Sequence, residues 1–475
     1  MKQGISGRRA PDPMTVERAP KSLRKTERLP AIVTIFLLGL TIPFILFLGP
    51  LRLSVYRLLL VVLFGPLVFM WLSGRAGRIR LPDIALLLMC VWIALSYAMI
   101  HGPSRAIEAG GIGLVETMGA YLIARIYVRT PTTFYTVVRV LFWVAMALLP
   151  LAVIETISGR SVALDIFEIF YKSYNTLYMD PRWGLRRVQS VFEHPILYGA
   201  FSSVIIGLGY FVLGYGKPVF RRIIYAFAGL LGVFLSLSSG PFVAAGAQMF
   251  LIAWDQVFKS IRERWVILSG LFLMGIVVIE LFANRSVAQI LISYVAFRKS
   301  SAWNRLRIWE HGTASVAKNP LFGVGQNEWE RPAFMPASID MFWLLPAVRF
   351  GLPSAVFMQL AFVSIFLLVL FRKNLGPRES EYRTGYLITL LGLYIAGWTV
   401  HYWNAVYVLF VFLLGCGFCF FNEDKKMDKN PGAQDAGPND HKGAASDRDA
   451  SERGRDVTVQ SGYTRQKKRH FRDKT

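Results

Sequence analysis

The chain has 475 residues, of which 54% are hydrophobic and only 17% are charged, and its formal net charge is +23. The apolar residues gather in about twelve stretches of roughly 17 or more residues with almost no charge, the length that a helix needs to cross a bilayer. This distribution excludes a large soluble enzyme and predicts an all-α, polytopic helical membrane protein.

The predicted membrane domain, residues 31–421, contains these stretches in a nearly unbroken series. The first stretch follows a polar segment and is soon followed by another, so it does not have the form of a cleavable signal peptide. The twelve expected spans cover residues 31–49, 55–73, 82–100, 109–127, 134–155, 196–214, 220–237, 241–257, 265–283, 346–371, 384–400 and 402–421.

Positive charge is concentrated in the short connections that follow even-numbered spans, as Arg75, Arg129, Lys217 and Arg262 illustrate. Short loops rich in lysine and arginine stay on the cytoplasmic side of a membrane. Both termini are therefore expected in the cytoplasm, with the chain crossing the membrane many times. Connections after odd-numbered spans are expected to face outward.

Both ends of the chain are polar. Residues 1–30 are predicted to be a disordered basic cytoplasmic arm near anionic lipid headgroups, and residues 422–475 a disordered charged cytoplasmic tail. Basic clusters beside a span ordinarily act as signals for topology and lipids. Membrane lipids are therefore the expected partners of this charge, and nucleic acid is not.

Two outward connections, about residues 156–195 and 284–345, are much longer than the others. In the first, aromatic residues at helical spacing over 162–178 predict a helix in the membrane interface. In the second, 303–318 is expected to form a short helix and 319–325 a tight turn. Long loops are usually functional, and guanidinium groups match phosphate oxygens with two parallel hydrogen bonds. The arginines of these loops therefore predict a phosphate-binding site.

The three cysteines, Cys90, Cys416 and Cys419, all lie inside predicted spans and are interpreted as small packing residues. No acidic pair and no cluster of histidine and cysteine has the spacing of metal ligands. Neither a metal nor another cofactor is expected.

Four sequence blocks together are similar to a known family. They are RRVQSVFEHPILYGAF (186–201), LSLSSGPFVAAG (235–246), RLRIWEHGTASVAKNPLFGVGQNEW (305–329) and DMFWLLPAVRFGLP (340–353). In their order and spacing they resemble the O-antigen ligase and O-unit polymerase family of integral membrane glycosyltransferases. The resemblance covers about residues 180–420, and a long outward loop between the ninth and tenth spans fits it.

This resemblance implies the transfer of a glycan from undecaprenyl diphosphate to an acceptor hydroxyl at the outer face of the inner membrane. It assigns Arg187 and Arg305 to the leaving diphosphate, with Arg307 and Arg349 as further candidates. Such a clamp places positive charge where negative charge develops in the transition state, and no metal is then required. The implied partners are a lipid-linked glycan donor, a glycan acceptor and other polysaccharide assembly proteins.

The general base is left open between three residues. Ligases of the family usually carry a His-Asn pair where this chain has Asp340 and Met341, so Asp340 is one candidate. His194 and Glu193 are the others. His194 is equally well explained as a residue that begins a helix and bonds to its backbone ahead of Pro195.

The leading hypothesis is a polymerase that joins lipid-linked repeat units into a surface polysaccharide or exopolysaccharide. The alternative in the same class is a ligase that transfers the finished glycan to an acceptor. A transporter or flippase would instead place charges at mid-membrane and show an internal repeat. A scaffold of a cell-envelope complex would have long loops without converging charges.

Overall fold

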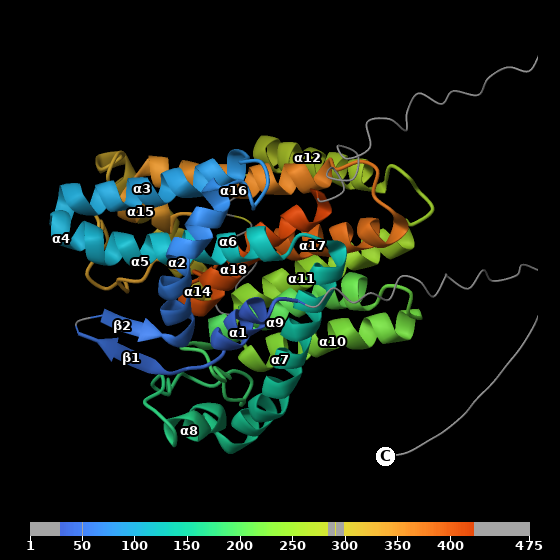
Figure 1. Cartoon of the computed structure of the whole chain (residues 1–475), viewed down its shortest axis with the longest axis horizontal. Helices are drawn as coiled ribbons and strands as arrows, with labels where there is room; N and C mark the ends of the chain where they lie inside the picture. Colours follow the sequence, from blue (N-terminus) through green and yellow to red (C-terminus); the bar gives the residue numbers. More distant parts are fainter. Residues whose placement is uncertain (1–28, 50, 284–289, 291–298, 422–475) are drawn as a thin grey trace, which may run out of the picture. The chain divides into compact units, whose positions relative to one another are not determined.

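The computed structural model describes residues 29–49, 51–283, 290 and 299–421 (Figure 1). All of them lie in one compact unit, Met1–Asp424. Nearly all of the predicted basic arm and the whole charged tail, 422–475, fall outside these residues.

The described residues are 71% helical with almost no strands, which confirms the all-α class. The helices are α1 Ala31–Gly39, α2 Val55–Leu72, α3 Leu81–His101, α4 Pro103–Arg105, α5 Gly111–Leu114, α6 Ala120–Tyr127, α7 Pro131–Ser158, α8 Val162–Glu168, α9 Pro195–Leu208, α10 Val219–Ser236, α11 Ser239–Val257, α12 Arg264–Phe282, α14 Lys299–Lys318, α15 Leu345–Phe350, α16 Leu352–Leu370, α17 Pro377–Gly397 and α18 Asn404–Cys416. Short π or 3-10 segments continue some of them: Ala106–Gly110, Val115–Gly119, Gly209–Leu213 and Gly417–Phe421.

Among the described residues, 9 helices are long and apolar enough to cross a membrane, so the protein is a polytopic membrane protein. Two less apolar helices, α11 and α17, lie at the positions of the expected spans 241–257 and 384–400. The expected span 346–371 is divided at Gly351 into α15 and α16.

The first expected span is wrong as a continuous helix. Helix α1 ends at Gly39, and two strands follow it, β1 Ile45–Leu48 and β2 Leu51–Ser54, which pair antiparallel. Pro43 explains the break, because a proline disfavours helical backbone in the residue before it and cannot donate a backbone hydrogen bond.

The interface helix expected over 162–178 is also shorter than predicted. Helix α8 ends at Glu168, and the backbone beyond it turns to meet β1, where the N–H of Ile45 donates to the carbonyl oxygen of Lys172 at 3.0 Å. Of the aromatic side chains that suggested the longer helix, Phe170 and Tyr171 are exposed, at 76% and 46%.

Helix α9 lies at the centre of the helical body and is buried along its whole length among α7, α10, α11 and α17. Gln248 of α11 joins it to its neighbour. The Gln248 side chain accepts from the N–H of Gly207 at 3.0 Å and donates to the carbonyl oxygen of Ser203 at 2.9 Å. This pair of bonds fixes the height of α11 against α9, and therefore the position of the residues that begin each helix.

The turn after α14 is held against α15 and α3 by hydrogen bonds. The N–H groups of Val324 and Gly325 donate to the carbonyl oxygens of Val348 and Arg349, at 3.0 and 2.7 Å. Figure 1 shows α3 running beside α16, and the indole of Trp92 in α3 donates to the carbonyl oxygen of Phe350 at 3.0 Å. The sequence blocks at 319–325 and 349–351 therefore fold as one unit.

Gly351 is the residue on which this arrangement depends. Its φ of +83° and ψ of 169° are open only to glycine, and a side chain there would meet the carbonyl of Leu321. We expect Gly351→Ala to lower the melting temperature of the detergent-solubilised protein, because the strain costs about 1–3 kcal/mol before any clash is counted.

Gly246→Ala is the matched control, because Gly246 lies within α11 and a Cβ atom there meets nothing within 4 Å. Replacing a helical glycine by alanine is neutral or stabilising. Equal melting temperatures for the two variants would contradict the role given to Gly351.

Candidate functional site

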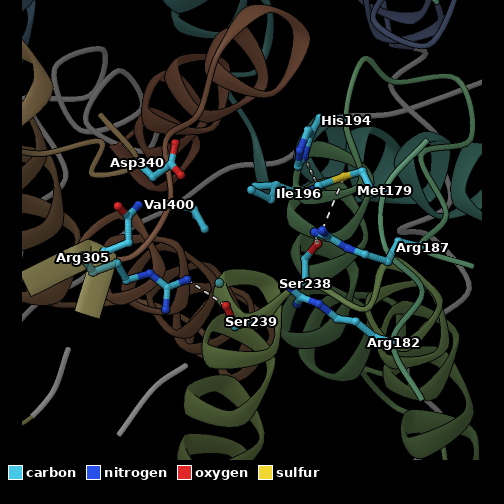
Figure 2. Close-up of a pocket in the computed structure, with 12 residues that line it drawn as sticks. Met179, Arg182, Arg187, His194, Ile196, Ser238, Ser239, Arg305, Asp340 and Val400 are labelled. Carbon is cyan, nitrogen blue, oxygen red and sulfur yellow. Dashed lines mark hydrogen bonds between the residues drawn. The ribbon is translucent and has the colours of Figure 1, made fainter. Parts of the chain in front are cut away.

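A cavity of about 290 Å³ lies where four connections between helices meet (Figure 2). Its walls come from the segment before α9, the α10–α11 turn, the segment from α14 to α15, and the α17–α18 connection. Its polar lining consists of Arg182, Arg187, His194, Ser238, Ser239, Asn304, Arg305 and Asp340.

These four connections are the ones that follow odd-numbered expected spans. Because they meet around one cavity, they lie at the same end of the helical body, as the charge pattern of the loops requires. Connections that follow even-numbered spans also meet one another, since Arg129 donates to the carbonyl oxygen of Arg75 at 2.5 Å. The arrangement supports the expected alternation of the chain across the membrane.

Arg305 of α14 is held by two of its three nitrogen atoms. Its Nε donates to the carbonyl oxygen of Thr399 at 2.9 Å, and its Nη2 donates to the hydroxyl of Ser239 at 2.7 Å. The third nitrogen, Nη1, is buried and has no hydrogen-bond partner among the described residues. Burial lowers the pKa of Arg305 to about 10, with Asp340 opposing the shift and Arg182 adding to it, so the group remains charged at neutral pH.

Arg187 and Arg182 reach the same α10–α11 turn from the loop before α9. The Nη2 of Arg187 donates to the hydroxyl of Ser238 at 2.9 Å, and the Nη1 of Arg182 donates to the carbonyl oxygen of Leu237 at 2.6 Å. Leu237 adopts a left-handed conformation with a φ of 44°, which turns the chain sharply between the two helices. One tight turn thus positions all three arginines of the cavity.

His194 is the residue that begins α9. Its Nδ1 accepts a hydrogen bond from the N–H of Ile196 at 3.0 Å. Burial, together with the nearby charges of Arg187 and Arg182, lowers the pKa of His194 to about 4. The imidazole is therefore neutral at neutral pH, and its remaining nitrogen, Nε2, carries the proton and acts as a donor.

Asp340 is the acidic residue of the cavity lining. Burial raises the pKa of its carboxyl group above the ordinary value, while the positive charge of Arg305 opposes that shift. The backbone next to it is well anchored, because the N–H of Phe342 donates to the carbonyl oxygens of Gly397 and Val400 at 2.8 and 3.0 Å. Figure 2 shows Asp340 and Arg305 on one side of the cavity and His194 on the other.

The structure thus brings together four of the residues singled out from the sequence: Arg187, His194, Arg305 and Asp340. Arg349 does not line the cavity and instead donates to the carbonyl oxygens of Gly325 and Asn327, at 3.1 and 2.9 Å. Arg307 is exposed and lies over the ring of Phe334, 5.1 Å from its centroid.

Glu193 lies next to the cavity in a separate polar chain. Its carboxylate accepts from the side-chain amide of Asn404 at 2.5 Å, and the amide oxygen of Asn404 accepts from Arg57 at 2.9 Å. Arg57 in α2 also pairs with Glu116 at 2.6 Å. The carboxylate of Glu193 is therefore bound to a side chain of α18 and is not among the groups that line the cavity.

Four polar residues of the lining were missed by the sequence analysis. Arg182 was passed over because only its neighbours resembled the family blocks, and Asn304 because it adjoins the block that begins at Arg305. Ser238 and Ser239 stood in a block that was interpreted only as a turn. For Ser238 and Ser239, the available signal is their position at the start of a helix, since serine is a preferred helix-starting residue.

No group of three or more metal-binding side chains was found among the described residues. The fold and the cavity define a polytopic membrane protein with a strongly cationic pocket at one end of its helices.

Residues 224–362 match the family model described as O-antigen ligase. This match confirms the resemblance to the O-antigen ligase and polymerase family, whose members are glycosyltransferase-like enzymes. It covers the α10–α11 turn, Arg305 and Asp340, whereas Arg182, Arg187 and His194 precede it. No curated protein sequence matches the chain.

Proposed function

We propose that the protein polymerises oligosaccharide repeat units carried on undecaprenyl diphosphate, at the periplasmic face of a bacterial inner membrane. The match to the O-antigen ligase model supports a function of the ligase or polymerase type. The proposed product is a surface polysaccharide or exopolysaccharide, and we expect the reaction to need no cofactor. We also propose that both termini lie in the cytoplasm.

The observation that carries the proposal is the convergence of three arginines on one small cavity. Arg182, Arg187 and Arg305 line it together with one carboxylate, from Asp340, and a neutral histidine. Bringing like charges together out of water is costly unless an anion compensates them. A diphosphate with several negative charges and two phosphate groups suits this surplus, because arginine binds phosphate oxygens in pairs.

The reaction that fits this arrangement is the displacement of diphosphate from the first carbon of a sugar. The oxygen of an acceptor hydroxyl forms a bond to that carbon while the bond from the carbon to the diphosphate oxygen breaks. The electron pair of the broken bond leaves on the diphosphate, where the arginines stabilise it. The hydroxyl proton passes to a general base.

Asp340 is the base that we propose. A carboxylate with a raised pKa accepts a proton more readily than an ordinary aspartate, and Asp340 lies in the same cavity as Arg305. His194 suits the role less well, since its Nδ1 already accepts from the N–H of Ile196 and its Nε2 carries the proton. We therefore assign His194 to hydrogen-bond donation, and we give Glu193 no direct role.

Deleting the gene in its host separates polymerisation from ligation. Loss of a polymerase should leave single repeat units on the lipid carrier and remove the long chains. The composition of carrier-linked glycan, measured by electrophoresis and mass spectrometry, is the readout. Long chains that accumulate on the carrier would contradict the proposal and identify the protein as a ligase.

Arg305→Lys should reduce the rate of transfer by about 100-fold, the order expected when one preorganised donor to a developing charge is lost. A lysine carries its three N–H donors on a single nitrogen, so it cannot reproduce the separate positions from which the guanidinium reaches Thr399, Ser239 and a phosphate. Arg307→Lys is the matched control, because Arg307 lies on the same helix but outside the cavity. Both variants are assayed as purified protein with a lipid-linked repeat unit. Equal rates would argue against a diphosphate at Arg305.

Asp340→Asn should lower the rate of transfer by about 100-fold or more, since it removes the proposed general base. A base works only when ionised, so the rate of the unmodified protein should fall as the pH drops through the pKa of Asp340. Because that pKa is raised, the fall should come at a higher pH than for an ordinary aspartate. The variant should lose this limb of the pH–rate profile, while His194→Asn, which preserves the helix start, should keep it. A limb that persists in Asp340→Asn would mean that another group is the base.

A further inference from the structure

Helix α11 begins at the wall of the cavity, where Ser238, Ser239 and Gly240 are all part of the lining. The first backbone N–H groups of a helix have no acceptor within the helix, and its N-terminus carries a partial positive charge. Such a helix start suits an anion when the donors remain open. The surroundings of the first turn of α11 determine whether its backbone N–H donors are open.

Ser238 stands at the position where a serine usually satisfies these donors, yet its side chain makes no such bond. Its hydroxyl accepts from Arg187 at 2.9 Å and donates to the carbonyl oxygen of Ser236 at 3.1 Å. The helix start is therefore left open because its serine is used to hold an arginine.

The sequence of the first turn leaves two backbone donors. Pro241 has no N–H, and the N–H of Phe242 already donates to the carbonyl oxygen of Ser238 at 3.2 Å. The remaining donors are the N–H groups of Ser239 and Gly240. Gly240 also packs tightly, since a side chain there would meet Val400 across the cavity wall.

A second, independent observation points to a ligand at this place. The Arg305 side chain, only 7% exposed, bonds Ser239 through Nη2, while its Nη1 is buried and has no partner among the described residues. A buried N–H donor without a hydrogen-bond partner costs free energy, and more so on a charged group. An acceptor from a ligand is therefore expected beside Nη1. Figure 2 shows Arg305 extending to Ser239 at the start of this helix.

We propose that the start of α11 is a phosphate subsite, in which the N–H groups of Ser239 and Gly240 and the Nη1 of Arg305 together bind one phosphate group of the lipid-linked diphosphate. This inference rests on the proposed function, which supplies the diphosphate. It adds backbone donors to the arginines, and it gives Ser238 and Ser239 the task of orienting Arg187 and Arg305.

The test compares Ser239→Pro with Ser239→Ala in the full-length protein, using inorganic pyrophosphate as the probe. Both substitutions remove the hydroxyl, but only proline also removes the backbone N–H. Ser239 is the first residue of the helix and Ser238 is extended, with a φ of −116° and a ψ of 123°, so the backbone accepts a proline here.

Binding is measured by calorimetry in a phospholipid-free detergent, so that lipid headgroups do not compete for the cavity. We expect Ser239→Pro to bind pyrophosphate about 10-fold more weakly than Ser239→Ala, the effect of one hydrogen bond to a charged group. Equal affinities for the two variants would overturn the subsite. Inorganic phosphate that binds as well as pyrophosphate would overturn the assignment to a diphosphate.

If Ser239→Pro fails to fold, Ser238→Asn replaces it. Asparagine is a strong helix-starting residue whose side-chain oxygen would take the free N–H of Gly240. This variant should fold at least as stably as the unmodified protein and bind pyrophosphate more weakly, and unchanged affinity would overturn the subsite.

The outcomes also separate this inference from the proposed function. If pyrophosphate binding is lost in Arg305→Lys but equal in the two Ser239 variants, the arginines bind the diphosphate and the backbone subsite is contradicted. If pyrophosphate binding depends on the Ser239 N–H but the purified protein transfers no glycan, the subsite is supported and the proposed polymerase function is contradicted.

Discussion

The arrangement of the cavity end of the helical body depends on how the protein holds like charges together. Three guanidinium groups line a cavity with one carboxylate, and each of them donates a hydrogen bond to a neutral acceptor of the same turn. The α10–α11 turn supplies these acceptors within three successive residues, Leu237, Ser238 and Ser239. Because the acceptors are uncharged, the arginines keep the positive charge that an anionic ligand requires.

The turn can do this because the helices on either side of it are fixed. Gln248 holds α11 against the buried α9, and His194 begins α9 beside the same cavity. The backbone after Asp340 bonds to Gly397 at the end of α17 and to Val400 in the α17–α18 connection. The same connection supplies the acceptor for Arg305 at Thr399. The positions of the charged side chains are thus set by helix packing together with the hydrogen bonds of the α10–α11 turn.

The sequence predicted the helical membrane class and four residues of the cavity, because long apolar stretches and arginine-rich motifs are local signals. It did not predict that Arg349 bonds a neighbouring turn, since that depends on how two distant blocks dock. It did not predict the hydrogen bonds of the serines for the same reason, as these form only when the loop before α9 and helix α14 lie beside them. The strand pair β1 and β2 was hidden because its residues are as apolar as those of a span.

The polar chain from Glu116 through Arg57 and Asn404 to Glu193 joins the N-terminal helices to the residue beside His194. Arg57 and Glu116 lie well outside the family match at 224–362. A fragment restricted to the matched region would therefore lack both the loop that carries Arg187 and the cation Arg57, which bonds Asn404 and Glu116 in this series of polar side chains. The matched region therefore does not contain the whole cavity lining, and homologues that differ in their first helices should differ in how the pocket is supported even where the matched segments agree.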